Sequence, residues 1–130
     1  MPDIVMTVKP RHIGDMFRGI KSYELRKTYP IKVPVDRVWI CKSGSGGRIV
    51  ASFRIGIIRN MTDDDDVTIA ELCAIKPDEV KKYRKNNGIL YGWKIEDFRY
   101  FDVDGKDKDI SDFGLTRPPQ SWCYAKEADG

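Results

Sequence analysis

The sequence predicts an α+β domain built on a small mixed β-barrel of five or six strands with about three helices. Short apolar or alternating runs, typical of strands, recur along the whole chain. Helical patterns are inserted only near the start and in the middle, whereas a doubly wound sheet would need them between all strands. The length of 130 residues fits a single domain, residues 1–130, with one real core.

The chain is expected to begin with a strand and a helix. The run "DIVMTV" is rich in β-formers, and Pro10 suits the first turn of a helix, where its missing N–H is not needed. Ile13, Met16 and Phe17 recur at helical spacing and are expected to pack together. Gly19 supplies the left-handed residue that ends such a helix.

The next segment, "SYELRK", alternates as a strand does. Tyr23 and Leu25 are expected on one face, with Ser22, Glu24 and Arg26 on the other. Strict alternation places Lys21 on the Tyr23 side, unless the turn after Gly19 twists the chain.

The middle of the chain predicts two strands and two helices. Residues 37–43 form the first strand and residues 48–61 the second, with alternate residues from Ile49 to Ile57 on one side and a bulge or bend at Gly56. A capping box of Thr68 and Glu71 begins one helix, and Pro77 begins the other. Residues 89–103 predict a strand, 104–109 a polar turn, 110–114 a helical turn, and 117–125 an extended tail.

Composition excludes several classes of function. The net charge of +3 permits a nucleic acid or phosphate partner without requiring one. Cys41, Cys73 and Cys123 form no CxxC pair, and His12 is the sole histidine, so we expect reduced thiols, no metal site and no cofactor. The N-terminus lacks a signal-peptide core and no run of 18 apolar residues exists, which predicts a cytoplasmic protein without membrane contact.

A family resemblance rests on two segments. "TVKPRHIGDMFRGIKSYELRK" combines a strand, Lys9-Pro10, a helix, and then Gly19, Lys21, Glu24 and Arg26 in the pattern Gly-x-Lys-x-x-Glu-x-Arg. The closing "RPPQSWCYA" carries a Pro-Pro-Gln-Ser-aromatic ending. Together they resemble the ASCH family of the PUA-like superfamily, as found in small bacterial, archaeal and phage proteins.

The resemblance implies a pseudo-barrel with a cleft beside the first helix and second strand. In the family this cleft is the proposed site for RNA or a nucleotide-like ligand, and the signature Lys, Glu and Arg point into it. One branch hydrolyses N4-acetylcytidine with the motif lysine, a threonine three residues later and a carboxylate just before a helix, and other members are reported as ribonucleases. Here Glu24 stands where that branch has threonine, and Cys73 or a neighbour stands where the carboxylate belongs, with Glu71 and Asp78 out of register.

The three signature side chains have suitable chemistry for a nucleotide. Arg26 presents a planar fork for phosphate, Glu24 can accept from an exocyclic amine of a base, and Lys21 adds a point charge, a nucleophile or a base. The structural alternative is a Glu24–Arg26 pair on one strand face with Lys21 exposed.

The other candidates lie outside the motif. Lys9 belongs to the signature, and the resemblance places Gln120, Ser121 and Trp122 across the cleft, where they could touch a ligand. Other aromatic side chains, Trp39 and Trp93 among them, are expected in the core. Basic residues at 81, 82, 84 and 85 are interpreted as a solvated helix face, the acidic run 63–66 as a mobile loop, and His12 as exposed.

Two functions remain in competition. The first is a module that binds RNA, a nucleotide or a modified nucleoside, with Lys9, Lys21, Glu24, Arg26 and residues 120–122 as ligand contacts. The alternative is a hydrolase of the same shape, an N4-acetylcytidine amidohydrolase or a ribonuclease, with Lys21 and Glu24 as the catalytic pair. A third hypothesis is a regulator whose cleft recognises a small anion.

Overall fold

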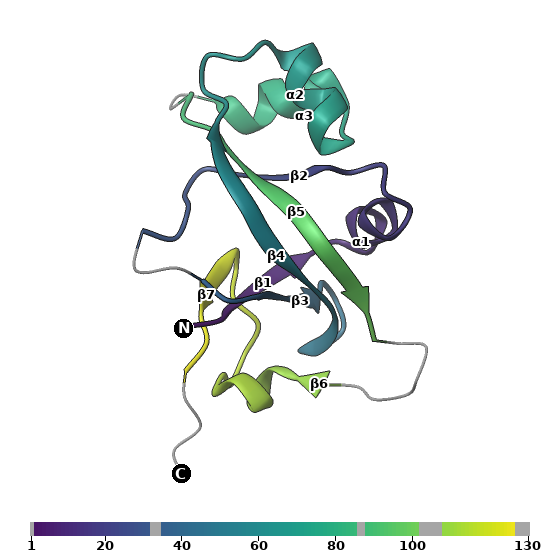
Figure 1. The fold of residues 1–130 in the computed structure, drawn as a ribbon, viewed down its shortest axis with the longest axis vertical. Coiled ribbons are helices and arrows are strands. Elements are labelled where there is room, and N and C mark those ends of the chain that lie inside the picture. Colours follow the sequence, from purple (N-terminus) through teal and green to yellow (C-terminus); the bar gives the residue numbers. More distant parts are fainter. Residues whose placement is uncertain (1, 32–34, 86–87, 102–107, 127–130) are drawn as a thin grey trace.

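The computed structural model describes residues 2–31, 35–85, 88–101 and 108–126. The elements follow the predicted order, with short additions near the C-terminus (Figure 1). The strands are β1 (Ile4–Val8), β2 (Tyr23–Arg26), β3 (Val38–Lys42), β4 (Arg48–Asn60), β5 (Tyr91–Tyr100), β6 (Lys108–Asp109) and β7 (Trp122–Tyr124). The helices are α1 (Pro10–Phe17), α2 (Asp66–Cys73), α3 (Pro77–Arg84) and the 3-10 helix η2 (Ile110–Phe113).

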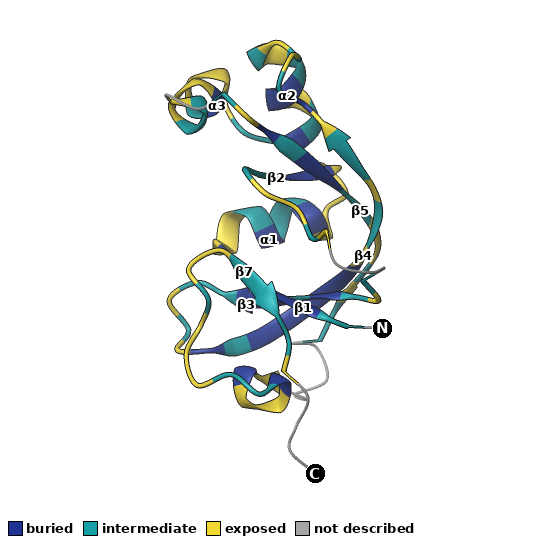
Figure 2. Cartoon of the chain, turned by 90° about the vertical axis from the view of Figure 1, so that its left-hand side faces the viewer, coloured by how far each residue is buried: buried dark blue, intermediate teal, exposed yellow. Residues whose placement is uncertain are grey.

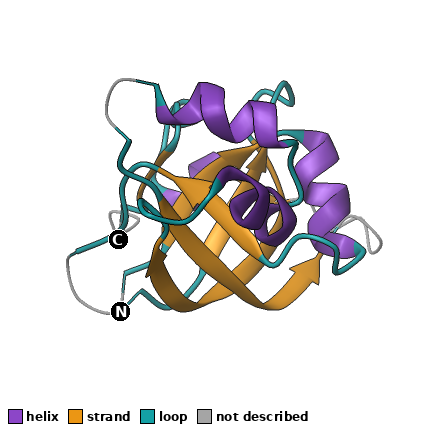
Figure 3. Cartoon of the chain, turned by 90° about the horizontal axis from the view of Figure 1, so that it is seen from above, coloured by secondary structure: helices purple, strands orange, loops and turns teal. Residues whose placement is uncertain are grey.

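One mixed sheet organises the described chain. Its strands run in the order β2-β5-β4-β3-β1-β7, and β6 adds a short pair to β4. β1 and β3 are parallel and the other pairs are antiparallel. Seen from above, the sheet curls around the interior and the helices gather on one side of it (Figure 3). The predicted α+β barrel-like fold with three helices is confirmed, as a curled half-barrel rather than a closed one.

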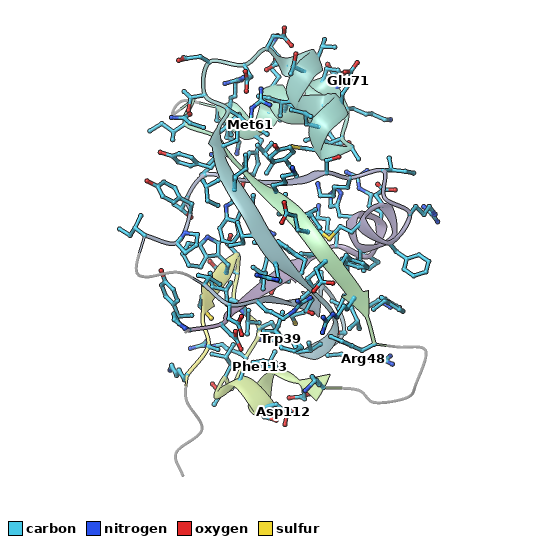
Figure 4. All side chains as sticks on the ribbon, viewed as in Figure 1. Trp39, Arg48, Met61, Glu71, Asp112 and Phe113 are labelled. Atoms are coloured by element: carbon cyan, nitrogen blue, oxygen red, sulfur yellow. The ribbon has the colours of Figure 1, made fainter. Side chains whose placement is uncertain are left out.

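The apolar side chains divide into three clusters along the long axis of the molecule. The central cluster packs β1, β3, β4 and β5 against Ile13 and Met16 of α1 (Figure 2). The second lies between the β2 strand and helices α2 and α3, where Met61 is buried at the end of β4 (Figure 4). The third holds Phe113 of η2, with Trp39 packed against it at the opposite end. Trp93 is fully buried, as predicted.

The long β4–β5 ribbon connects the two ends of the molecule and bends on the way. Its register shifts between Ser52 and Arg54 and again between Ile55 and Ile58, which confirms the predicted irregularity around Gly56. Because a bulge breaks the alternation of faces, Ile57 is exposed and Ile58 packs against the core instead. The prediction that Ile57 shares the buried face of this strand is therefore wrong.

Two local predictions are also corrected. Phe17 is exposed, since α1 is a short helix whose buried face is centred on Ile13 and Met16. The N-cap of α2 is Asp65, whose carboxylate accepts from the Thr68 N–H at 2.7 Å, so Thr68 lies inside the helix and makes no capping box with Glu71.

The acidic run is held in place by hydrogen bonds. Arg84 of α3 donates to the Asp66 carboxylate at 2.9 Å, to the Thr62 carbonyl at 2.7 Å and to the Asp64 carbonyl. Asp64 also pairs with Arg59 at 3.2 Å. Arg84 is thus a structural residue, whereas residues 81, 82 and 85 remain exposed as predicted. The polar turn predicted at 104–109 lies mostly outside the described residues.

No helix within the described ranges has the length and apolar character needed to cross a membrane.

Candidate ligand-binding cleft

A polar cleft opens between α1, β2, α3 and the segment that precedes β7. Its volume is about 320 Å³. The floor comes from β2, where alternation turns Glu24 and Arg26 away from the Tyr23 side that packs under α2 and α3. The lining residues are Thr7, Val8, Lys9, Arg11, His12, Lys21, Glu24, Leu25, Arg26, Ser43, Ile75, Glu79, Tyr83 and Gln120.

Lys21 and Glu24 form a buried pair at the base of the cleft. Their side chains are 2% and 8% exposed, and Lys21 Nζ lies 3.8 Å from Glu24 Oε2. Lys21 Nζ also donates a 2.6 Å hydrogen bond to the carbonyl of Cys73 at the end of α2. Lys21 lies before β2 begins, so the alternation of faces along the strand does not place its side chain on the Tyr23 side. The turn after Gly19 therefore brings Lys21 and Glu24 together.

Arg26 connects the two open edges of the half-barrel, β2 at one end of the sheet and the β1–β7 pair at the other. Its Nη1 donates to Ser121 Oγ at 2.8 Å, and its Nη2 donates to the Thr7 carbonyl of β1 at 2.9 Å. Its Nε lies 3.3 Å from Glu24 Oε1. β2 and the β1–β7 pair are not joined by a strand ladder, so these side-chain bonds connect the two edges. Both terminal nitrogens of Arg26 are thus already engaged within the protein.

Three polar atoms in this wall are buried without a hydrogen-bond partner among the described residues. They are Glu24 Oε2, Arg26 Nε and His12 Nδ1. A buried polar atom that lacks a hydrogen bond costs free energy, so such atoms point to a missing partner. Glu24 Oε2 is an acceptor, which makes a donor group on a ligand the natural complement.

His12 is a cleft residue, which corrects the prediction that it is exposed. It is half-buried on α1 and lines the cleft beside Lys21 and Glu24. Burial, followed by the nearby Lys21 ammonium, lowers the pKa of His12 below its usual 6.5. The imidazole is therefore mainly neutral at pH 7, with one ring nitrogen a donor and the other an acceptor.

The predicted ligand contacts outside the motif divide into two groups. Lys9 and Gln120 line the cleft and are exposed. Ser121 is engaged with Arg26 between the two open edges of the half-barrel. Trp122 lies outside the cleft lining: its ring packs edge-on against Trp93, and its Nε1 donates to Thr28 Oγ1 at 2.9 Å. Its role as a ligand contact stays a prediction.

The lining also contains residues that the sequence did not single out, four of which form much of its walls. Arg11 and Glu79 form a 2.6 Å ion pair from α1 to α3, and Thr7 and Tyr83 complete the walls. Burial raises the pKa of the Tyr83 phenol, so the phenol stays neutral at pH 7. Only the packing of α3 opposite α1 brings Glu79 within reach of Arg11.

Besides Glu24, the lining holds one further carboxylate among the described residues, that of Glu79, which pairs with Arg11 at 2.6 Å. The carboxylates considered from the sequence, Glu71 on α2 (Figure 4) and Asp78 on α3, are exposed and lie outside the lining. Cys73 is fully buried, and burial raises the pKa of its thiol to about 11, which confirms its assignment to the core. Within the described ranges no three His, Cys, Asp or Glu side chains gather as metal ligands.

Comparison with solved structures identifies the fold. A single-substitution variant of the ASCH protein from Zymomonas mobilis superposes with a TM-score of 0.75 at 14% identity, over 98% of this chain and 92% of that one. This chain has the ASCH fold. A second variant of the same protein gives 0.74 at 14% identity over 96% and 91%, and the unsubstituted ASCH protein gives 0.71 at 16% identity over 96% and 88%.

The fold likeness extends over nearly the whole of both chains, and it confirms the predicted resemblance at the level of architecture. No protein-family model matches the sequence, and no curated protein matches it significantly. The ASCH fold and the chemistry of the cleft are therefore the features of this chain from which a function can be proposed.

Proposed function

We propose that this ASCH-fold protein binds RNA or a nucleotide, with a base seated against Glu24 at the bottom of the cleft. The observation that carries the proposal is the buried Glu24 Oε2, which has no hydrogen-bond partner among the described residues. A carboxylate accepts from the exocyclic amine of cytosine, and it does so most strongly where water is excluded. The volume of about 320 Å³ suits one small ligand rather than a duplex.

The charges around the cleft support an anionic ligand. Lys9 and Arg11 stand at the exposed part of the lining, whereas Lys21 and Glu24 lie at its buried base. This arrangement, with cations at the opening and a carboxylate at the base, suits a ligand with a polar base at one end and phosphate at the other. The ASCH fold, which is associated with nucleic-acid ligands, adds independent weight.

The test compares Glu24→Gln with a matched change on the surface, Glu71→Gln. Binding of cytidine and of labelled single-stranded RNA is measured by calorimetry and fluorescence anisotropy. We expect Glu24→Gln to weaken both about tenfold, because a good base-edge contact contributes about 1–3 kcal/mol. Glu71 is exposed outside the cleft and its change should alter neither. Equal binding by the two variants would show that the base does not sit on Glu24, and circular dichroism checks that both are folded.

The hydrolase alternative is favoured by the pairing of Lys21 with Glu24 in the cleft. Against it, their 3.8 Å separation exceeds the roughly 2.6–3.2 Å used for proton transfer, and Lys21 Nζ is held by the Cys73 carbonyl. Wild type and Lys21→Ala are therefore assayed with N4-acetylcytidine and labelled RNA. Acetate release or RNA cleavage by the wild type, lost in the folded variant, would establish the enzyme; binding without turnover supports the proposal above.

A further inference from the structure

The cleft carries one ion pair that neither the motif nor the fold requires. Arg11 Nη2 lies 2.6 Å from Glu79 Oε2, and both residues line the cleft. Arg11 comes from the first turn of α1 and Glu79 from the first turn of α3, so the pair connects two helices that are 68 positions apart in the sequence. Unlike the buried Lys21–Glu24 pair, this one is accessible, with side chains 58% and 33% exposed.

Arg11 is the guanidinium of the cleft that is available to a ligand. Arg26 already donates through both terminal nitrogens to Ser121 and Thr7, and its side chain is only 13% exposed. The first turn of α1 contains no acidic residue, and the carboxylate that pairs with Arg11 comes from another helix. An anion beside Arg11 would meet a guanidinium fork that offers two donors.

We propose that Arg11 binds the phosphate of the nucleotide ligand, and that Glu79 occupies Arg11 as an internal competitor until the phosphate displaces it. The inference deepens the proposed function and rests on it. Glu79 then acts as a selectivity device. A ligand without phosphate leaves the Arg11–Glu79 pair intact, whereas a phosphorylated one exchanges a singly charged partner for a more highly charged one.

The exchange is energetically reasonable. Exposed Arg–carboxylate pairs are weak, so breaking one changes an equilibrium constant only a few-fold. A phosphate monoester carries about −1.5 to −2 charges at pH 7 and offers three acceptor oxygens, which the planar guanidinium fork matches in two-point contact. No large rearrangement is needed, because Arg11 already lies at the lining of the cleft.

The test measures the affinities of cytidine and cytidine 5′-monophosphate for the full chain by calorimetry. We expect Glu79→Gln to tighten the monophosphate about two- to fivefold and to leave cytidine unchanged. Arg11→Gln should weaken the monophosphate about tenfold, again without effect on cytidine. Asp78→Asn is the matched control, because it removes the same charge from the preceding residue of α3, which is exposed and outside the lining; it should alter neither affinity.

The double variant Arg11→Gln/Glu79→Gln separates partner exchange from a general change in the electrostatic field. Partner exchange requires that Glu79→Gln no longer tighten the monophosphate once Arg11 is absent. Tightening that persists in the Arg11→Gln background, or that also appears with Asp78→Asn or with cytidine, would overturn the inference.

The outcome for the proposed function is read separately. If Glu24→Gln weakens cytidine binding while Glu79→Gln leaves the affinity for the monophosphate unchanged, the base site stands and only the exchange at Arg11 is rejected. If neither probe binds to any variant, both proposals are wrong. Arg11 and Glu79 are exposed enough for these substitutions to be tolerated, which thermal unfolding of each variant verifies.

Discussion

Helix α1 separates two hollows of nearly equal size that differ in the charge of their lining. The cleft measures about 320 Å³ and is lined by charged side chains from α1, β2 and α3. The groove on another face of the helix measures about 330 Å³. Its lining is mostly apolar and consists of Pro10, Ile13, Gly14, Phe17, Lys42, Val50 and Tyr100.

The difference shows that the buried charges, rather than the volume, distinguish the candidate site. The groove is lined mainly by apolar side chains, and two of its rings contact each other, since Phe17 and Tyr100 lie 5.7 Å apart between centroids. The cleft instead keeps Lys21 and Glu24 away from water, and a buried ion pair is a poor way to gain stability. A pair of this kind that is retained in a concave wall is a physical argument for a ligand.

The largest effect is expected at the buried pair. Lys21→Met leaves the Glu24 carboxylate buried without its ammonium, which should lower the free energy of unfolding by about 3 kcal/mol. Adding Glu24→Leu removes the carboxylate that Lys21→Met leaves with Arg26 alone, and it should recover at least about 1 kcal/mol of that loss. Urea unfolding of both variants measures the difference. A double variant that is less stable than Lys21→Met would mean that the pair is a net structural asset, contrary to the comparison.

A smaller effect on the free energy of unfolding is expected when the pH is lowered, because His12 lies on the cleft side of α1. The charged groups around His12 are Lys21, Glu24, Arg11 and Glu79, and burial with Lys21 lowers its pKa in the folded state. The unfolded chain therefore binds this proton first, so stability falls as the pH drops below about 6.5 and through the folded pKa.

The measurement compares wild type with His12→Gln from pH 8 to pH 5 by urea unfolding. The variant should lose less stability than the wild type over this range, and the two curves should run parallel above pH 7. Identical slopes throughout would indicate that His12 is as well solvated in the folded protein as in the unfolded one, against its placement in the cleft.

The smallest effect is expected on the groove side of the same helix. Phe17 is 65% exposed, so Phe17→Ala should cost less than about 1 kcal/mol and leave the binding of cytidine 5′-monophosphate unchanged. Met16→Ala, one residue earlier and buried, is the matched control and should destabilise several times more. Weakened nucleotide binding in Phe17→Ala would mean that the groove takes part in recognition and that the contrast drawn between the hollows is wrong.

Much of the architecture could be predicted because local signals are strong in this chain. Pro10 and Pro77 occupy first-turn positions of α1 and α3, and Gly19 adopts the left-handed conformation expected of a helix end. Alternation in β2 correctly places Glu24 and Arg26 opposite Tyr23. These predictions succeed because each depends on neighbours within a few residues.

Side-chain placements that depend on distant residues could not be predicted in this way. Ile57 departs from the predicted buried face because a register shift in β4 depends on the partner strand β5. Trp122 contacts Trp93 and Thr28, and Arg26 contacts Ser121 and the Thr7 carbonyl. These contacts arise because the curled sheet brings together residues that lie far apart in the sequence.

By itself the sequence determined the elements, their order and the set of charged side chains on β2, because helix caps, proline geometry and two-residue alternation act over short distances. Only the tertiary structure decided what surrounds those charges. The curled sheet and the packing of α3 opposite α1 set the Arg11–Glu79 pair across the cleft, place His12 beside Lys21, and leave Glu24 Oε2 buried without a hydrogen bond within the described chain. Burial and long-range pairing are properties of the packed chain, and no local pattern encodes them.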